Sequence, residues 1–307
     1  MLMTTSPGTQ YHHLARTPSH RWWRPILGTV VLLVLGAVVM LGSYLAYVAV
    51  AAATGQPDGP DGTASFGPLG ELAIGFLAIG ALLPVIMLVA RLTQDRPAGS
   101  LSSIEGRIRW RWLLTCLPVA AAAITIFLAG GVVLSALTGV DAELDEPLAG
   151  WGPFLTATAV LLLVVPFQAA AEEYMCRGWL LQAVGSVMRR PWVPIVFQAL
   201  VFAALHGWGT PFGFFDLAVF GTIAGWLTVR TGGLEAAITL HVMNNLLSSV
   251  IAAAFGQLTI DETAADMPWQ MAAVDFPVLL GFAAVIVWLF NRREAKKRNY
   301  ELVGSGQ

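Results

Sequence analysis

Three short motifs with ionisable side chains interrupt apolar stretches in the second half of the chain. They comprise Glu172, Glu173 and Arg177 in the first motif, Phe202 and His206 in the second, and His241 and Asn245 in the third. Carboxylates and imidazoles can transfer protons, and the same side chains can bind zinc. Imidazole and carboxamide N–H groups can donate hydrogen bonds to an oxyanion. These residue types therefore indicate hydrolysis, metal binding or proton transfer.

The spacing within each motif predicts which side chains lie together. Residues four apart share a helix face, whereas direct neighbours point about 100° apart. Glu173 and Arg177 are therefore predicted to pair. Glu172 is expected to point elsewhere, without a partner in its own helix, and to need a polar group from another segment. His241 and Asn245 are also four apart and are predicted to share a face.

The composition indicates that these groups lie in a membrane. Of the 307 residues 56% are apolar and only 12% are charged, against about a quarter charged in soluble domains. The net charge is −2, so no basic surface is available for nucleic acid, and the high hydrophobicity excludes a disordered chain. Cys116 and Cys176 lie in apolar runs and are predicted to be buried thiols.

Apolar runs of about 17 residues or more can cross the hydrocarbon as helices. The chain contains such runs at roughly 26–53, 69–90, 112–138, 152–187, 193–208, 212–230, 233–255 and 274–291. We therefore expect an all-α, polytopic membrane helical bundle of about eight transmembrane helices. A kink or break is expected at Pro166 in the long fourth run. Gly221 and Gly225, four residues apart, predict close packing between helices.

The charged loops predict the orientation. If the eight runs alternate, every Lys and Arg except Arg177 lies on one side, which is the cytoplasmic side by the positive-inside rule. The opposite loops hold only acidic residues, namely Asp58, Asp61, Asp141, Glu143, Asp145, Glu146, Asp261, Glu262 and Asp266. Both termini are thus predicted to be cytoplasmic, in a multi-pass protein of the plasma membrane.

We divide the chain into five segments on this basis. They are a cytoplasmic tail at 1–25, N-terminal transmembrane helices at 26–149, a catalytic helical core at 150–255, a last loop and helix at 256–291 and a basic cytoplasmic tail at 292–307. His12, His13 and His20 in the first tail are expected to be solvated.

An ionisable side chain near the bilayer centre costs roughly 2.5–3.5 kcal/mol on insertion scales, so each one needs a reason. At 1.5 Å per helical residue, Glu172, His206 and His241 lie about 25, 20 and 12 Å from the cytoplasmic ends of their helices. They could meet in one cavity that opens towards the cytoplasm. An ion pair or a lone histidine is by itself typical of packing, but the joint presence of three motifs favours a site.

The three motifs resemble those of the CAAX-protease and bacteriocin-processing (CPBP, or Abi) family of intramembrane proteases, which includes the type II CAAX prenyl endopeptidases. The family pattern is EExxxR, FxxxH and HxxxN, each on a separate transmembrane helix. The motifs given above match it in order and spacing, within about 150–255.

The resemblance implies an endopeptidase that cleaves a membrane-associated protein or peptide. It implies that Glu172 is the general base and that His206 orients the water. His241 and Asn245 would then donate hydrogen bonds to the tetrahedral intermediate, with Glu173 and Arg177 as a supporting ion pair.

Three alternatives stay open at this point. Zinc or another divalent metal could be held by Glu172, His206 and His241, although a metal-free mechanism is slightly favoured because the HExxH spacing of soluble zinc proteases is absent. Buried carboxylates and histidines could instead relay protons in a proton-coupled transporter. A non-catalytic immunity or scaffold protein could retain the same fold.

Overall fold

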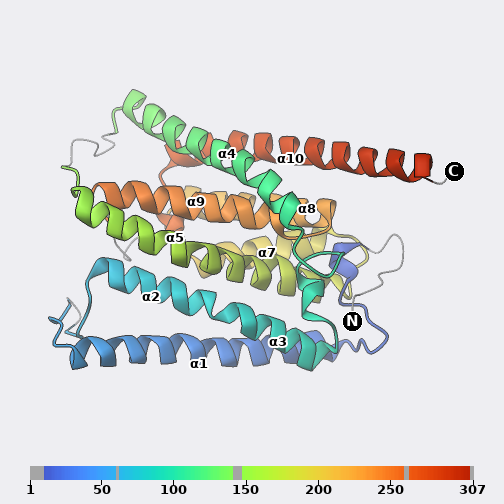
Figure 1. Ribbon diagram of the computed structural model, residues 1–307, viewed down its shortest axis with the longest axis horizontal. Helices are drawn as coiled ribbons and strands as arrows, with labels where there is room; N and C mark the ends of the chain where they lie inside the picture. The colour runs from blue at the N-terminus through green and yellow to red at the C-terminus, as the bar shows by residue number, and fades with distance from the viewer. Residues whose placement is uncertain (1–9, 60–61, 141–146, 259–262, 305–307) are drawn as a thin grey trace.

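The computed structural model describes residues 10–59, 62–140, 147–258 and 263–304, and within these ranges the named secondary-structure elements are all helices (Figure 1). In chain order these are η1 (Tyr11–His13), α1 (Trp23–Ala53), α2 (Pro68–Gly80), α3 (Leu82–Gln94), η2 (Ala98–Leu101), α4 (Trp110–Leu137), α5 (Trp151–Glu173), η3 (Tyr174–Leu180), α6 (Leu181–Gly185), α7 (Trp192–Leu205), α8 (Pro211–Thr231), α9 (Glu235–Ala254), η4 (Ala264–Asp266) and α10 (Trp269–Gly304). The predicted all-α bundle is confirmed. The predicted loop acids Asp61, Asp141, Glu143, Asp145, Glu146, Asp261 and Glu262 lie outside the described residues.

Seven helical stretches in the described ranges are long and apolar enough to cross a membrane. They are Trp23–Ala53, Pro68–Gln94, Trp110–Leu137, Trp151–Gly185, Pro211–Thr231, Glu235–Ala254 and Trp269–Lys296. The remaining predicted span, 193–208, corresponds to α7, which has 14 residues. Such a helix measures about 21 Å, less than the hydrocarbon thickness of about 30 Å. The chain is thus a multi-pass membrane protein in which α7 is too short for a full crossing.

The long fourth span is not broken at Pro166. Helix α5 continues through this proline, and the irregularity follows the helix as the π-helical turn η3. Membrane helices tolerate proline because neighbouring helices and side chains can satisfy the freed backbone groups. A π turn often marks a functional site. This one begins directly after Glu173 and contains Arg177.

Helices α7 and α8 form a tight antiparallel pair. Gly221 lies so close to α7 that a Cβ there would come within 2.9 Å of Ala199. The Nε2 of Gln198 donates to the carbonyl of Gly221 over 2.7 Å. The predicted small-residue packing is therefore confirmed at Gly221.

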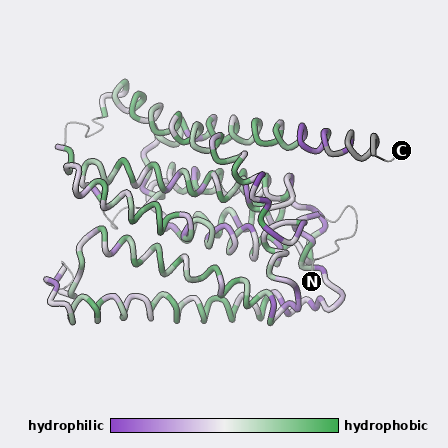
Figure 2. Tube along the Cα trace, in the orientation of Figure 1, coloured by the Kyte–Doolittle hydropathy of each residue, from purple (hydrophilic) through white to green (hydrophobic). Residues whose placement is uncertain are grey.

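The helices are arranged in three groups in Figure 1. Helices α1, α2 and α3 pack together on one side, α4 and α10 pack together on the other, and α5, α7, α8 and α9 lie between them. Large apolar side chains such as Leu33 in α1, Leu114 in α4 and Leu163 in α5 are exposed, as expected where lipid is the solvent. Helix α1 begins and α10 ends at the same end of the bundle, where Figure 2 shows hydrophilic stretches.

The N-terminal segment differs from the solvated tail that was predicted. Tyr11 is 1% exposed and His12 is fully buried. The Tyr11 hydroxyl donates to the carbonyl of Leu101 over 2.5 Å, and Gly185 in α6 leaves room for the backbone of His12. Residues 11–15 thus cover the end of the bundle, so the prediction for His12 was wrong.

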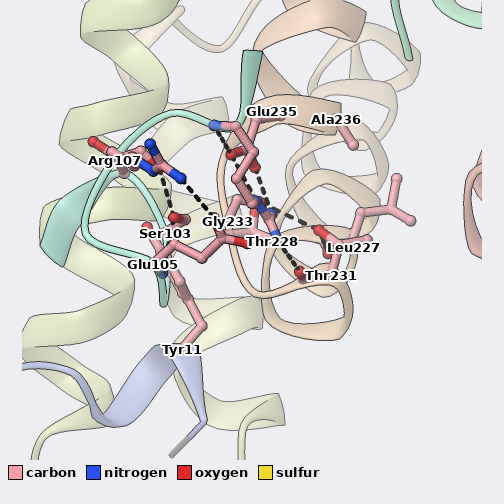
Figure 3. Close-up of polar contacts among 12 residues, drawn as sticks. Tyr11, Ser103, Glu105, Arg107, Leu227, Thr228, Thr231, Gly233, Glu235 and Ala236 are labelled. Carbon is pink, nitrogen blue, oxygen red and sulfur yellow. Dashed lines mark hydrogen bonds and ion pairs between the residues drawn. The ribbon is translucent and has the colours of Figure 1, made fainter. Parts of the chain in front are cut away.

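The loop between α3 and α4 docks on the turn between α8 and α9 through a buried ion pair (Figure 3). Nη2 of Arg109 lies 2.6 Å from Oε2 of Glu235, and Nε lies 2.9 Å from Oε1. The backbone N–H of Arg109 also donates to Oε1, and Nη1 donates to the carbonyl of Thr231. Although burial lowers the pKa of Arg109, the hydrogen bond and charge of Glu235 raise it overall. This pair anchors the first half of the chain to the second.

Candidate active site

The first motif forms the predicted ion pair at the end of α5. Nη1 of Arg177 lies 2.9 Å from Oε1 of Glu173, and both side chains are fully buried. The guanidinium also lies over the ring of Phe202 on α7, 4.3 Å from its centroid. Such cation–π contact offsets part of the cost of burying the charge. Phe202 of the second motif therefore supports the first.

His241 on α9 lies between the two glutamates of α5. Its Nδ1 is 2.8 Å from Oε1 of Glu173, and its Nε2 is 3.5 Å from Oε2 of Glu172. A carboxylate on one ring nitrogen fixes the orientation and tautomer of an imidazole. The α5–α9 interface is thus held by a polar contact in the middle of the apolar bundle.

Glu172 has a partner in its own helix that the sequence analysis missed. Nε2 of Gln168, one turn earlier, donates to Oε1 of Glu172 over 2.7 Å. The Gln168 carbonyl oxygen accepts from Nδ2 of Asn245 over 3.0 Å. The expectation that Glu172 lacks an intrahelical partner was therefore wrong, because only charged residues and histidines were considered. A polar side chain four residues before Glu172 was the available signal.

His206 lies at the end of α7, where the helix stops. Its Nδ1 is 2.8 Å from the carbonyl oxygen of Phe202. A carbonyl only accepts hydrogen bonds, so Nδ1 carries the proton and Nε2 of the neutral ring is left as an acceptor. The structure thus brings His206 to the same region as His241, while the side chain of Glu172 contacts Gln168 and His241 instead.

A small cavity of about 30 Å³ joins the second and third motifs, and this volume suits a water molecule. Its lining residues come from α7, α8, α9, η4 and the segment that follows it, and α10: Phe202, His206, Asp216, Leu217, Phe220, His241, Asn244, Asn245, Ala264, Met267 and Asp275. The sequence analysis missed the two aspartates. Each is an ionisable residue inside an apolar run, so the cost argument applied to the other motifs would have found them.

The residues present do not fit a three-ligand zinc site. Among the described residues, no three His, Cys, Asp or Glu side chains are grouped as metal ligands. Glu172 and His241 are neighbours, whereas the third candidate, His206, lines the small cavity, whose lining does not include Glu172. We derive no step through a metal.

Comparison with known proteins supports the family resemblance. Residues 154–247 match the family described as type II CAAX prenyl endopeptidase Rce1-like, and this range includes all three motifs. The family resemblance is confirmed. We refer to residues 154–247 as the CAAX-protease segment.

One curated relative extends the similarity beyond the CAAX-protease segment. The uncharacterized protein YyaK of Bacillus subtilis (strain 168) is 23% identical over 250 residues, covering 75% of this chain and 79% of the relative. No solved structure matches the chain significantly. At the level of the family, the similarity is to CAAX-type intramembrane proteases.

Proposed function

We propose that this protein is an intramembrane endopeptidase that hydrolyses a peptide bond of a membrane-associated protein or peptide. The proposal depends mainly on the carboxylate of Glu172. Gln168 holds one of its oxygens, while the other makes no hydrogen bond among the described residues and faces His241. A buried carboxylate oxygen kept free of partners suits a base that must accept a proton from water.

The first step is attack of water on the scissile carbonyl carbon. Glu172 takes one proton from that water, and the new C–O bond forms as the carbonyl oxygen becomes an oxyanion. Glu173 accepts a hydrogen bond from Nδ1 of His241, so the imidazole stays oriented beside the base. Arg177 balances the charge of Glu173, which explains why two adjacent glutamates serve different purposes.

The oxyanion needs hydrogen-bond donors. Asn245 has a second N–H besides the one that donates to Gln168, and its side chain lines the cavity. We assign Asn245 as one donor. His241 is the second donor when Nε2 also carries a proton, because its Nδ1–H already donates to Glu173. His206 orients the water through Nε2. Replacing one donor of this kind costs on the order of 100–1,000-fold in rate, which we expect for Asn245→Ala.

We further propose that the protein lies in the plasma membrane with both termini in the cytoplasm. The support is the distribution of Lys and Arg along the chain. Cysteine labelling of single variants at Ser19 and Gln56 with a membrane-impermeant reagent tests this, with the native Cys116 and Cys176 replaced by Ala. We expect Gln56→Cys to be labelled in intact cells and Ser19→Cys only after lysis. The reverse labelling pattern would show that the protein has the opposite orientation.

The decisive experiment is cleavage of labelled membrane peptides, prenylated and unprenylated, by the purified protein in liposomes. We expect the wild type to cleave and Glu172→Gln to fold normally without measurable turnover. Glu71→Gln, which changes a half-buried glutamate in α2, is the matched control and keeps activity. Turnover should persist in excess chelator.

Specific outcomes would reject the proposal. Undiminished cleavage by Glu172→Gln would remove the proposed base. Absence of cleavage products across a broad peptide library would favour a scaffold. Proton-coupled uptake into the same liposomes, with no cleavage, would favour a transporter.

A further inference from the structure

Two buried aspartates from different helices meet at the cavity that holds His206 and His241. Asp216 in α8 is 5% exposed and Asp275 in α10 is 4% exposed. Both line the cavity, and their carboxyl groups are within hydrogen-bonding reach of each other. Asp275 is contributed by α10, outside the CAAX-protease segment.

A structural ion pair does not account for the two aspartates. Within the part of the chain that the structure describes, neither forms a salt bridge with Lys, Arg or His. Oδ1 of Asp275 is buried without a hydrogen-bond partner. Buried carboxyl groups are costly in a membrane and are rarely retained without a partner or a function. Asp275 therefore carries an unused polar atom into the cavity wall.

The contact between the two carboxyl groups has a chemical consequence. Two ionised carboxylates only accept hydrogen bonds, so a hydrogen bond between them requires one proton. Two acids that lie this close share that proton, as in aspartic proteases. The pair is thus a source of one proton at the cavity, on α8 and α10, while the proposed base lies on α5.

We propose that the Asp216–Asp275 pair is the general acid that protonates the leaving amine, an inference that rests on the proposed peptidase function. As the C–N bond breaks, its electron pair stays on the amine nitrogen, and the nitrogen takes the shared proton. The proton that Glu172 removed from water later returns to the aspartate pair through solvent. The immediate products are the carboxylic acid and the amine, and transfer of the acid proton to the amine gives the carboxylate and the ammonium, so no oxidant or metal is needed.

The test compares two substrates that differ only in the leaving group. In one the scissile bond is the natural amide, and in the other it is a thioester. A thiolate leaves without protonation because its conjugate acid has a pKa of about 8.5, whereas an amide nitrogen must be protonated. Loss of a general acid therefore slows the amide and spares the thioester. The ratio of the two rates within one preparation is independent of the fraction of protein that is folded.

We expect Asp216→Asn and Asp275→Asn to reduce amide cleavage about 100-fold or more and thioester cleavage less than about fivefold. Glu71→Gln is the matched control, with an unchanged ratio. Equal losses on both substrates would assign the aspartates a structural role and overturn the inference. Unchanged amide cleavage would also overturn it. If the wild type cleaves the amide, the proposed function stands in either case, and if it cleaves neither substrate, both proposals fail.

Discussion

Two buried Arg–Glu pairs hold this molecule together, and they differ in how completely their atoms are satisfied. The Arg109–Glu235 pair at the end of the bundle uses Nε, Nη1 and Nη2 of the arginine and both oxygens of the glutamate. The Arg177–Glu173 pair within the membrane leaves Nε and Nη2 of the arginine and Oε2 of the glutamate without hydrogen-bond partners. We call the Arg109–Glu235 pair saturated, because the named side-chain atoms all have hydrogen-bond partners, and the Arg177–Glu173 pair unsaturated, because three of its atoms have none.

This difference in hydrogen bonding distinguishes the structural Arg109–Glu235 pair from the Arg177–Glu173 pair at the proposed site. Native proteins satisfy nearly all buried polar groups, so each exception calls for an explanation. At Arg109–Glu235 all three guanidinium nitrogens join the α3–α4 loop to Thr231 in α8 or to Glu235 in α9. At the site, Oε1 of Glu173 contacts both Arg177 and His241, whereas its Oε2 has no hydrogen-bond partner. The free oxygen of Glu172 lies on the other side of the same imidazole. The site is thus one of the places in the described residues where buried polar atoms lack hydrogen-bond partners, and the only one of the two pairs where we place chemistry.

The sharpest test replaces both members of the site pair by apolar residues. Glu173→Leu with Arg177→Met removes two buried charges together, which is often neutral for stability. Turnover should nevertheless fall by on the order of 1,000–10,000-fold, because His241 loses the carboxylate that orients it, and an analogous loss in a serine protease costs about 10⁴. Thermal unfolding and peptide cleavage measure the two effects. Retained cleavage in a folded double variant would show that the pair is only structural.

The matching change at the saturated pair should give the opposite result. Arg109→Met leaves Glu235 buried without its partner and should cost about 3–5 kcal/mol of stability. Adding Glu235→Leu should recover part of that loss, and cleavage per folded molecule should stay at the wild-type level. Denaturant unfolding of the single and double variants yields the coupling energy. A loss of turnover in the folded double variant would contradict this assignment, because it would show that the Arg109–Glu235 pair also contributes to catalysis.

The helices and the three motifs could be predicted from the sequence because both follow short-range rules. Apolar runs predicted the spans, and four-residue spacing predicted the Glu173–Arg177 pair. The contacts between helices could not be derived this way. Nothing in the chain order shows that His241 lies between two glutamates of α5, or that Asp216 and Asp275 meet, since both contacts depend on how separate helices pack.

A smaller effect is expected for Gln168, which links the unsaturated site to Asn245. Gln168→Leu removes a hydrogen bond to the charged Glu172, and such bonds contribute about 1.5–3 kcal/mol. If the carboxylate is held for catalysis, cleavage per folded molecule should also fall about 10–100-fold, beyond any loss of stability. Gln198→Leu, which removes a glutamine that bonds backbone carbonyls between α7 and α8, is the matched control and should reduce stability more than turnover. The reverse ranking of the two variants would contradict the assignment.

The smallest predicted effect concerns the N-terminal segment that covers the end of the bundle, where His12 is buried. Burial lowers the pKa of His12 to about 4 from an ordinary value of 6.5. Between these values the released N-terminal segment binds a proton that the docked segment does not, so docking weakens as the pH falls from about 6.5 to about 4, by up to tenfold per pH unit. Hydrogen exchange of residues 11–15 should therefore report weaker protection at pH 5 than at pH 7. His12→Gln should remove this pH dependence and His20→Gln should retain it, so an identical response in both variants would assign the effect to another group.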